Sequence, residues 1–198
     1  MLVPPRCVVC PASAPVSKPL CRACASALES LPAPARVSIR GLDSSWAAVP
    51  HDGVARELVA ALKFRRLLAA ADPIADLIAR RAPGGLLCGA LVAVPAAPSR
   101  SLRRGFDPAE EIAVRLAALS GLPIRAPLRR ANAPPQVGRS RADRISRPPR
   151  IWAAEAAPRQ VLLLDDVQTT GATLRSCADA LRSAGAERVA PITFARTL

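Results

Sequence analysis

The pattern of apolar and polar positions predicts helices and strands in alternation over most of the chain. Apolar side chains recur three or four residues apart in residues 53–64 and 107–120, a spacing that places them on one face of a helix. A further helix is expected to begin at Asp72, which precedes a proline as helix-capping residues often do. Residues 91–94 and 161–164 are short, uninterrupted apolar runs, which are typical of buried strands in a parallel sheet.

The C-terminal part of the chain continues this alternation after one interruption. Residues 171–184 predict a helix and residues 188–194 a last strand, in which Pro191 indicates an edge position or a bulge. The interruption is residues 131–160, where prolines and arginines break any period. We expect a long loop there, with its mobile part at about 131–158. Strands that alternate with helices predict the α/β fold class, with a mainly parallel sheet flanked by helices.

The first 36 residues show little helical or strand periodicity and carry two C-x-x-C pairs, formed by Cys7 with Cys10 and by Cys21 with Cys24. Four thiolates at this spacing are typical of a closed, tetrahedral structural zinc site, with redox-active or free thiols as the alternative. We therefore predict two domains, a small zinc-binding module at 1–36 and a main domain at 45–198. Cys88 and Cys177 stand alone and are expected to be buried thiols.

Composition narrows the range of partners and locations. The chain of 198 residues carries a net charge of +13, and residues 100–150 hold twelve arginines against four acidic residues. A basic segment favours an anionic partner, either a phosphorylated small molecule or a nucleic acid, although a solvated loop is the commoner explanation. No stretch has the roughly 20 apolar residues of a membrane-spanning helix. No secretory signal opens the chain, so we expect a cytoplasmic protein without a membrane span.

The segment 161–174 carries the clearest chemistry. Two adjacent carboxylates, Asp165 and Asp166, follow an apolar strand, and a turn then opens a helix with Thr169, Thr170, Gly171, Ala172 and Thr173. Backbone N–H groups at a helix N-terminus bind phosphate, hydroxyls add donors, and a glycine lets the anion approach closely. The segment therefore predicts a phosphosugar site, with the ribose hydroxyls on the two aspartates and the 5′-phosphate on residues 169–173. Aspartates that only cap the helix are the alternative.

This segment resembles the phosphoribosyl diphosphate (PRPP) signature of the type I phosphoribosyltransferases. Further matches occur in the order found in the ComF family, which includes GntX-like proteins: residues 62–64, residues 92–95, Arg100, residues 104–106, Gln136, Arg144 and residues 193–196. That family joins a cysteine-rich segment to a phosphoribosyltransferase fold, so the resemblance implies this fold for the main domain.

The resemblance also implies roles for single residues. A loop at residues 95–101 would receive the pyrophosphate half of PRPP, with Pro95, Arg100, Arg103 and Arg104 as the binding residues. Gln136 and Arg144 would belong to a mobile loop that closes on PRPP. Mg²⁺ would accompany PRPP at the site, held through one or two carboxylates and water.

Three positions depart from the family pattern. Asp107-Pro108 replaces the usual Asn-Gln that follows Arg-Gly-Phe, Arg147 replaces an asparagine, and Trp152 replaces a phenylalanine. The first change favours a stronger helix start, because aspartate caps helices well and proline suits the first helical position.

Two functions are consistent with these features. One is a phosphoribosyltransferase that transfers phosphoribosyl from PRPP to an acceptor that the sequence does not identify, with release of pyrophosphate. The alternative is a non-catalytic accessory protein of DNA uptake in natural competence, which binds single-stranded DNA, with a DNA-uptake helicase as a candidate partner. Only five aromatic residues are present, so stacking platforms for bases are scarce. His51, the only histidine, is expected to lie on the surface.

Overall fold

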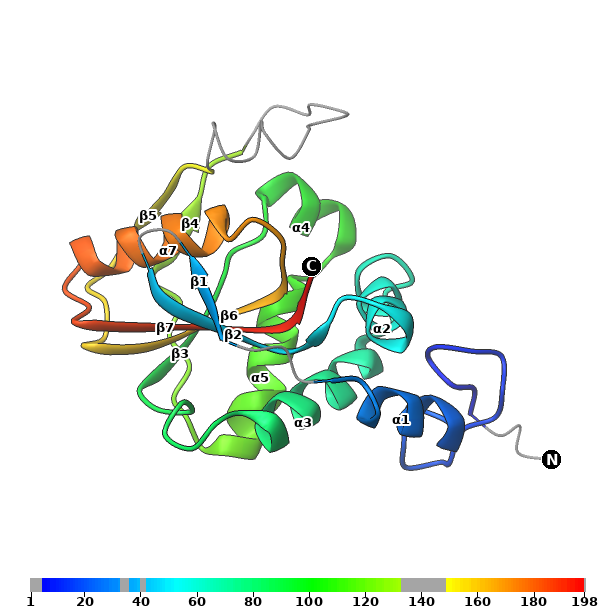
Figure 1. Ribbon diagram of the computed structural model, residues 1–198. Coiled ribbons are helices and arrows are strands. Elements are labelled where there is room, and N and C mark those ends of the chain that lie inside the picture. The colour runs from blue at the N-terminus through cyan, green and yellow to red at the C-terminus, as the bar shows by residue number, and fades with distance from the viewer. Residues whose placement is uncertain (1–4, 33–35, 40–41, 133–148, 198) are drawn as a thin grey trace.

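A five-stranded sheet forms the centre of the computed structural model, which describes residues 5–32, 36–39, 42–132 and 149–197 (Figure 1). Its strands are β1 (Val37–Ile39), β2 (Leu42–Pro50), β3 (Ala90–Ala93), β6 (Gln160–Gln168) and β7 (Arg188–Arg196). The order is β1-β2-β7-β6-β3, with β1 antiparallel to β2 and the other four strands parallel. The predicted α/β class with a mainly parallel sheet is confirmed.

Helices cover both faces of this sheet. One face carries α2 (Gly53–Lys63), α3 (Ala71–Arg81) and α5 (Pro108–Ser120), and the other carries α7 (Ala172–Ser183). Figure 1 shows α7 above the sheet and α3 and α5 below it. Along β6, Leu162 and Leu164 belong to the apolar cluster of α2, α3 and α5, while Val161 and Leu163 belong to the cluster of α7. Because both faces are buried, the strand is apolar at successive positions, as the sequence pattern indicated.

Most of the predicted helices are confirmed, but two local expectations are wrong. The expected helices 53–64, 107–120 and 171–184 correspond to α2, α5 and α7. The helix α3 begins at Ala71 after the 3-10 turn η1 (Leu68–Ala70), so Asp72 lies in its first turn and does not cap it. The expected loop at 95–101 contains the start of a short helix, α4 (Pro98–Arg104).

The prediction of an edge position for Pro191 is wrong, because β7 lies between β2 and β6. The register shows why a proline is tolerated there. β7 pairs with β6 from Arg188 onward, but its pairing with β2 starts only at Ile192. Pro191 therefore precedes the part of β7 that has a partner strand on both sides.

Part of the expected loop 131–160 is regular structure. The strand β5 (Ile151–Ala153) pairs antiparallel with β4 (Leu128–Arg130), and the two form a small separate sheet. Residues 133–148, which include Gln136, Arg144 and Arg147, lie outside the described residues.

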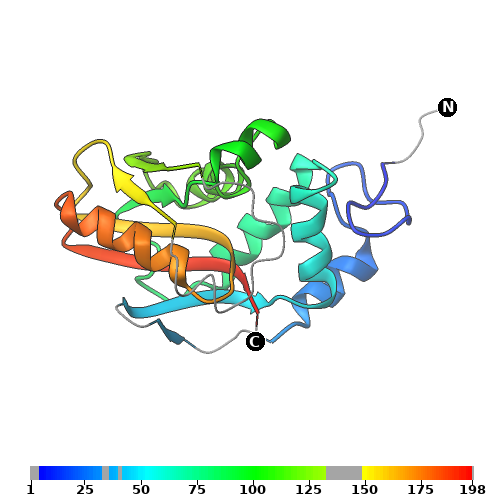
Figure 2. The same ribbon diagram turned by 90° about the horizontal axis from the view of Figure 1, so that it is seen from above.

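The cysteine-rich segment contains a helix that its periodicity did not predict, α1 (Arg22–Glu29). Leu28 of this helix belongs to the same apolar cluster as the buried residues of α2 and α3. The guanidinium of Arg81, at the end of α3, donates to the carbonyl oxygens of Leu31 at 2.7 Å and Glu29 at 2.5 Å. Figures 1 and 2 both show α1 beside α2 and α3, so the cysteine-rich segment packs onto one end of the helical layer.

Candidate functional site

The carboxyl ends of the four parallel strands meet at one edge of the sheet, where ligands bind in open α/β folds. β6 extends past its apolar run to Gln168, so Asp165 and Asp166 lie within the paired strand and not in the turn after it. Asp165 lies opposite Thr193 in the register with β7. This pairing fixes the backbone of both aspartates, and it makes their side chains point in different directions.

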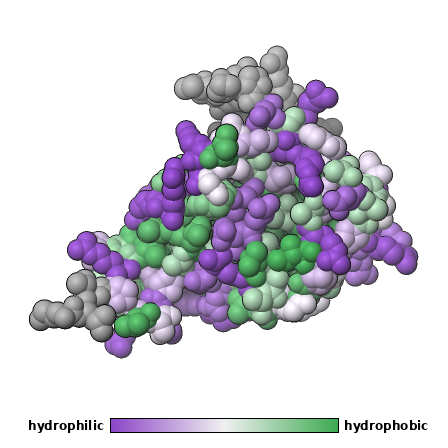
Figure 3. Space-filling model, turned by 180° about the vertical axis from the view of Figure 1, so that it is seen from behind, coloured by the Kyte–Doolittle hydropathy of each residue, from purple (hydrophilic) through white to green (hydrophobic). Residues whose placement is uncertain are grey.

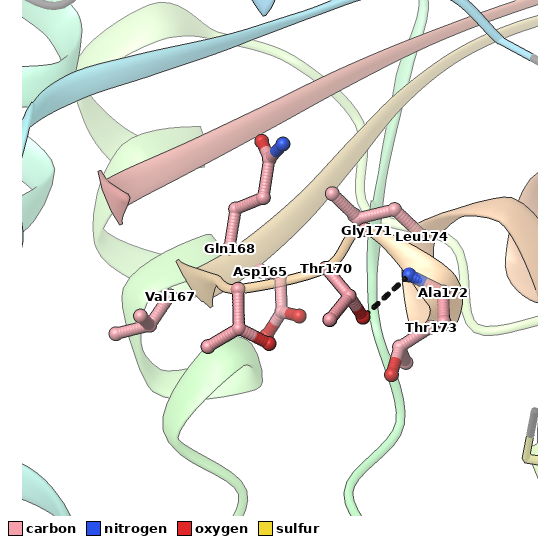
Figure 4. Close-up of a pocket in the computed structure, with 9 residues that line it drawn as sticks. Asp165, Val167, Gln168, Thr170, Gly171, Ala172, Thr173 and Leu174 are labelled. Carbon is pink, nitrogen blue, oxygen red and sulfur yellow. Dashed lines mark hydrogen bonds between the residues drawn. The ribbon is translucent and has the colours of Figure 1, made fainter. Parts of the chain in front are cut away.

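A pocket lies where β6 joins α7 (Figure 4). Its lining residues are Asp165, Val167, Gln168, Thr169, Thr170, Gly171, Ala172, Thr173 and Leu174. Figure 4 shows Asp165, Thr170 and Thr173 on one side of the β6–α7 connection, whereas Gln168 points to the other side. The Gln168 side chain accepts a hydrogen bond from the Ser45 hydroxyl at 2.8 Å. The predicted turn residues and one of the two predicted aspartates are thus brought together.

The polar groups of this pocket suit an anion. The first turn of α7 contains no acidic residue, and its N–H groups lack partners within the helix. The Thr170 hydroxyl accepts a long hydrogen bond of 3.4 Å from the Ala172 N–H, which Figure 4 marks. This N-terminus combines the positive end of the helix dipole with three threonine hydroxyls, and such a set of donors binds phosphate.

Gly171 is required at this turn for a reason that the sequence did not reveal. Its φ is +74°, in the left-handed region, and a Cβ built on it would lie 2.9 Å from two side-chain carbons of Ile39. The glycine therefore lets β1 pack against the turn that forms the pocket. The atoms that approach Gly171 closely in the structure are side-chain carbons of Ile39.

Asp165 and Asp166 have different surroundings. The Asp166 side chain is 8% exposed, and its Oδ2 lies 2.7 Å from the Nζ of Lys63 at the end of α2. Asp165 lines the pocket and accepts a hydrogen bond from the Asp166 N–H at 2.9 Å. Burial and the neighbouring Asp166 charge raise the pKa of Asp165 to about 8, although Lys63 opposes the shift. The structure therefore separates the two aspartates that the sequence assigned to one role.

Lys63 is the residue that sequence reasoning missed. Lys63 falls within residues 62–64 of the family resemblance, which assigns it no role. A signal was available, because Lys63 is one of two lysines in a chain with 28 basic residues and it ends a predicted helix at the sheet edge.

One of the predicted pyrophosphate residues, Arg104, contacts Lys63. The Nε of Arg104 donates to the Lys63 carbonyl oxygen at 2.8 Å, and the Arg104 guanidinium lies 5.9 Å from the centre of the Phe106 ring. Burial lowers the pKa of Arg104, and the positive charges of Arg100 and Arg103 add to this effect. Arg100 and Arg103 are exposed. The Arg104 side chain thus joins the short helix α4 to the end of α2.

Asp107 fixes the chain around this basic helix. Its side chain is buried, and it accepts hydrogen bonds from the N–H groups of Ala96, at 2.5 Å, and of Ala109, at 3.0 Å. It therefore caps α5 and at the same time holds the segment that follows β3. Burial raises the pKa of Asp107.

Two hydrogen bonds join the segment after β3 to the region that leads out of β4. The guanidinium of Arg130 donates to the carbonyl oxygen of Pro95 at 3.1 Å, and the Asn132 side chain accepts from the Ser99 N–H at 3.0 Å. Pro95 therefore lies next to a guanidinium that the sequence analysis did not single out.

His51 lies at the same edge of the sheet, in the connection between β2 and α2, where it is half-buried. Its N–H donates to the Arg196 carbonyl oxygen at 2.7 Å, and this bond joins the ends of β2 and β7. Burial lowers the pKa of His51, and the nearby Lys63 charge lowers it further.

The four N-terminal cysteines form a second candidate site. Their Sγ atoms all lie within 4.8 Å of one another, with the Cys10 Sγ 3.7 Å from that of Cys21 and 3.6 Å from that of Cys24. A tetrahedral ion with Zn–S distances of 2.3 Å would set its sulfurs about 3.8 Å apart. The cysteine residues present therefore fit a structural zinc ion.

Comparison with known proteins gives likenesses to solved structures. The solved structure of the allosteric regulatory enzyme of purine biosynthesis is similar to this chain with a TM-score of 0.40 and 22% sequence identity. The similarity covers 63% of this chain and 26% of that one, so the chain spans about a quarter of that protein. No protein-family model matches the chain, and no curated protein matches it.

None of the helices in the described part of the chain is both long and apolar enough to cross a membrane. On the face shown in Figure 3, hydrophobic side chains occur in separate areas with hydrophilic ones between them.

Proposed function

We propose that this protein binds PRPP and transfers its phosphoribosyl group to an acceptor, with release of pyrophosphate. The observation that carries the proposal is the pocket that unites Asp165 with Thr169–Thr173 at the start of α7. Phosphate is recognised by N–H and hydroxyl donors, whereas sugar hydroxyls are recognised by a carboxylate. Both kinds of protein group line this one pocket. In this proposal the main domain at 45–198 has the type I phosphoribosyltransferase fold, and the chain is related to the ComF family.

Each part of the pocket has a task in this proposal. The N–H groups and hydroxyls of residues 169–173 bind the 5′-phosphate, and Asp165 accepts hydrogen bonds from the ribose hydroxyls. Charge grows on the departing pyrophosphate as the bond to C1 of the ribose breaks. Arg100, Arg103 and Arg104 on α4 stabilise that charge with their guanidinium groups.

Two metal ions belong to the proposal. Mg²⁺ bound with PRPP would neutralise charge on the diphosphate, and Asp165 is the carboxylate of the pocket that could hold it directly or through water. Zinc on Cys7, Cys10, Cys21 and Cys24 would tie together a module at 1–36 that has few large apolar residues of its own.

Isothermal titration tests the proposal directly. Wild-type protein is titrated with PRPP in the presence and absence of Mg²⁺, and the Asp165→Asn variant and the Thr173→Val variant are titrated in the same way. The proposal expects binding that depends on Mg²⁺ and weakens at least tenfold in both variants. The matched control is Thr197→Val, an exposed threonine beyond the end of β7, which should bind as the wild type does. Absence of PRPP binding by the wild type would refute the proposal.

Single-stranded DNA binding is a second candidate function that one observation favours. Phe64 is 74% exposed directly after Lys63 and before Arg65 and Arg66, so an accessible ring lies among cations. Rings and cations together form the platforms that bind single strands. A fluorescent oligonucleotide titrated at several salt concentrations tests this function. Binding should weaken steeply with salt and should also weaken in a Phe64→Ala variant.

A further inference from the structure

We propose that Lys63 is a further ligand-binding residue of this site, that its ammonium binds the diphosphate of PRPP, and that Asp166 is the positioning residue that holds it. This inference rests on the proposed function. It also removes Asp166 from the group of residues that contact the ribose, which is the role that the sequence suggested.

The contact between the two side chains carries the first step. Lys63 Nζ lies 2.7 Å from Asp166 Oδ2, with the lysine side chain 24% exposed and the aspartate side chain 8% exposed. The carboxylate is therefore largely enclosed, whereas the ammonium remains partly accessible. An ammonium has three N–H donors, and this ion pair uses one of them. The remaining donors are available to an anion that reaches the sheet edge.

The position of Lys63 carries the second step. It is the last residue of α2, and its carbonyl oxygen accepts a hydrogen bond from Arg104 Nε at 2.8 Å. A second bond, from the Arg66 guanidinium to the Arg103 carbonyl oxygen at 2.8 Å, joins the same two segments. The end of α2 is thereby fixed to α4, the helix that presents the predicted pyrophosphate arginines.

The balance of charge identifies the class of ligand. Lys63, Arg100, Arg103 and Arg104 contribute four positive charges to this group of side chains, and three carboxylates, those of Asp165, Asp166 and Asp107, act on them. Both oxygens of Asp107 already accept backbone N–H groups. The group therefore has an excess of positive charge, and a compact anion with several charges, such as a diphosphate, would neutralise it.

Asp166 cannot take a sugar hydroxyl in the same way as Asp165. Asp165 lines the pocket at the start of α7, and Asp166 does not. Its enclosed carboxylate is compensated by Lys63, and a buried carboxylate without such a partner is costly. Its effect on ligand binding therefore passes through the lysine that it orients.

Titrations with three probes separate the parts of this inference: PRPP with Mg²⁺, inorganic pyrophosphate with Mg²⁺, and ribose 5-phosphate. Lys63→Met should weaken the binding of PRPP and pyrophosphate by about 10- to 100-fold, the loss of one charge-assisted hydrogen bond, and should leave ribose 5-phosphate binding unchanged. Lys63→Arg should keep most of the affinity for all three. An equal loss for ribose 5-phosphate and pyrophosphate in Lys63→Met would overturn the inference, because it would indicate general damage to the fold.

A double variant separates ligand binding from simple charge compensation. Lys63→Met and Asp166→Asn should each lower the melting temperature, and the double variant should recover much of it, because no buried charge is left unpaired. Pyrophosphate affinity should stay low in the double variant. If the double variant bound pyrophosphate as tightly as the wild type, Lys63 would serve only to neutralise Asp166.

The matched control is the ion pair of Arg115 with Glu111, at 2.7 Å and with side-chain exposures of 24% and 28%. Arg115→Met should change stability without changing the affinity for any of the three probes. Failure of the wild type to bind PRPP would count against the proposed function itself. If the wild type bound PRPP and Lys63→Met bound it and pyrophosphate equally well, only the inference about Lys63 would fall.

Discussion

Asp165 and Asp166 are neighbours in β6, yet Asp166 forms an ion pair with Lys63 at 2.7 Å whereas Asp165 lines the pocket beside α7. Adjacent side chains of a strand point to opposite faces, so one strand supplies two different electrostatic environments. Of the two carboxylates only that of Asp165 lines the pocket, and its pKa is raised.

The first prediction is a pH dependence of PRPP binding. Because burial and the Asp166 charge raise the pKa of Asp165 to about 8, this carboxyl is largely protonated at pH 7 in the free protein. Binding that needs the carboxylate should strengthen as the pH rises from about 6.5 to 8.5 and then level off. The phosphates of the ligand, with a second pKa near 6, change little over most of this range. Titrations across the range provide the measurement, and an Asp165→Asn variant should show a much flatter profile.

The raised pKa of Asp165 also predicts that the stability of the folded protein falls as the pH rises, whereas PRPP binding strengthens. The pKa of Asp165 is higher in the folded protein than the value of about 3.9 expected for an unfolded chain. Between these values the folded state holds the extra proton, so stability falls as the pH rises toward 8. Asp165→Asn should therefore melt at a higher temperature than the wild type at pH 8, by about 2–4 °C for each kcal/mol recovered, and at a similar temperature near pH 4. A lower melting temperature for the variant at pH 8 would contradict the assigned burial.

The third prediction concerns Gly171, which lies against Ile39. Gly171→Ala should destabilise the protein by the cost of a left-handed alanine, about 1–2 kcal/mol, plus about 1–3 kcal/mol for the contact with Ile39. Gly121→Ala is a matched control, because Gly121 has φ +73° and no atom within 4 Å of its Cβ position. Denaturant unfolding of both variants gives the difference. Equal losses would show that Ile39 moves aside at no cost.

The fourth prediction concerns the metal. Purified protein should contain about one zinc ion per chain, and Cys10→Ser should lose it, because Cys10 is one of the four clustered thiols. The melting temperature should also fall, since the cysteine module packs in the same apolar cluster as α2 and α3. Elemental analysis and thermal melting provide the measurements. Cys88→Ser is the control, because Cys88 lies outside this cluster of thiols, and zinc-free wild-type protein with the same melting temperature would contradict the site.

The fifth prediction concerns Asp107. Asp107→Ala removes the cap of α5 and leaves the Ala96 N–H without its acceptor, so it should cost about 2–4 kcal/mol of unfolding free energy. Asp52→Ala is the comparison, because Asp52 caps α2 in an exposed position and accepts only from the Gly53 N–H. It should cost about 1 kcal/mol. Denaturant unfolding measures both, and equal costs would mean that the bond to Ala96 adds nothing.

The elements that the sequence predicted well are those whose burial leaves a regular pattern. β6 is apolar on both faces because helices cover both, and α5 has a capping aspartate and a proline at its start, followed by an αL glycine, Gly121, at its end. Local signals of this kind do not depend on the rest of the fold. The clustering of the four cysteines was predicted for the same reason, since the spacing alone constrains two ligand pairs.

The parts that were missed depend on contacts between distant segments. The short strands β4 and β5 gain their order from each other across residues 133–148, and the helix α4 carries no buried residue that would mark it. The separation of Asp165 from Asp166 follows from strand pairing that continues to Gln168, which the polar sequence did not suggest. Lys63 was missed because its partner lies about a hundred residues away in the chain.

The most direct measurement of the central claim is the crystal structure of the protein grown with PRPP and Mg²⁺. The account predicts the 5′-phosphate on the N–H groups and hydroxyls of residues 169–173, Asp165 on the ribose hydroxyls, and the Lys63–Asp166 pair intact with the diphosphate beside it. A phosphate bound elsewhere on the protein, or an Asp165 carboxylate turned away from a bound sugar, would contradict it.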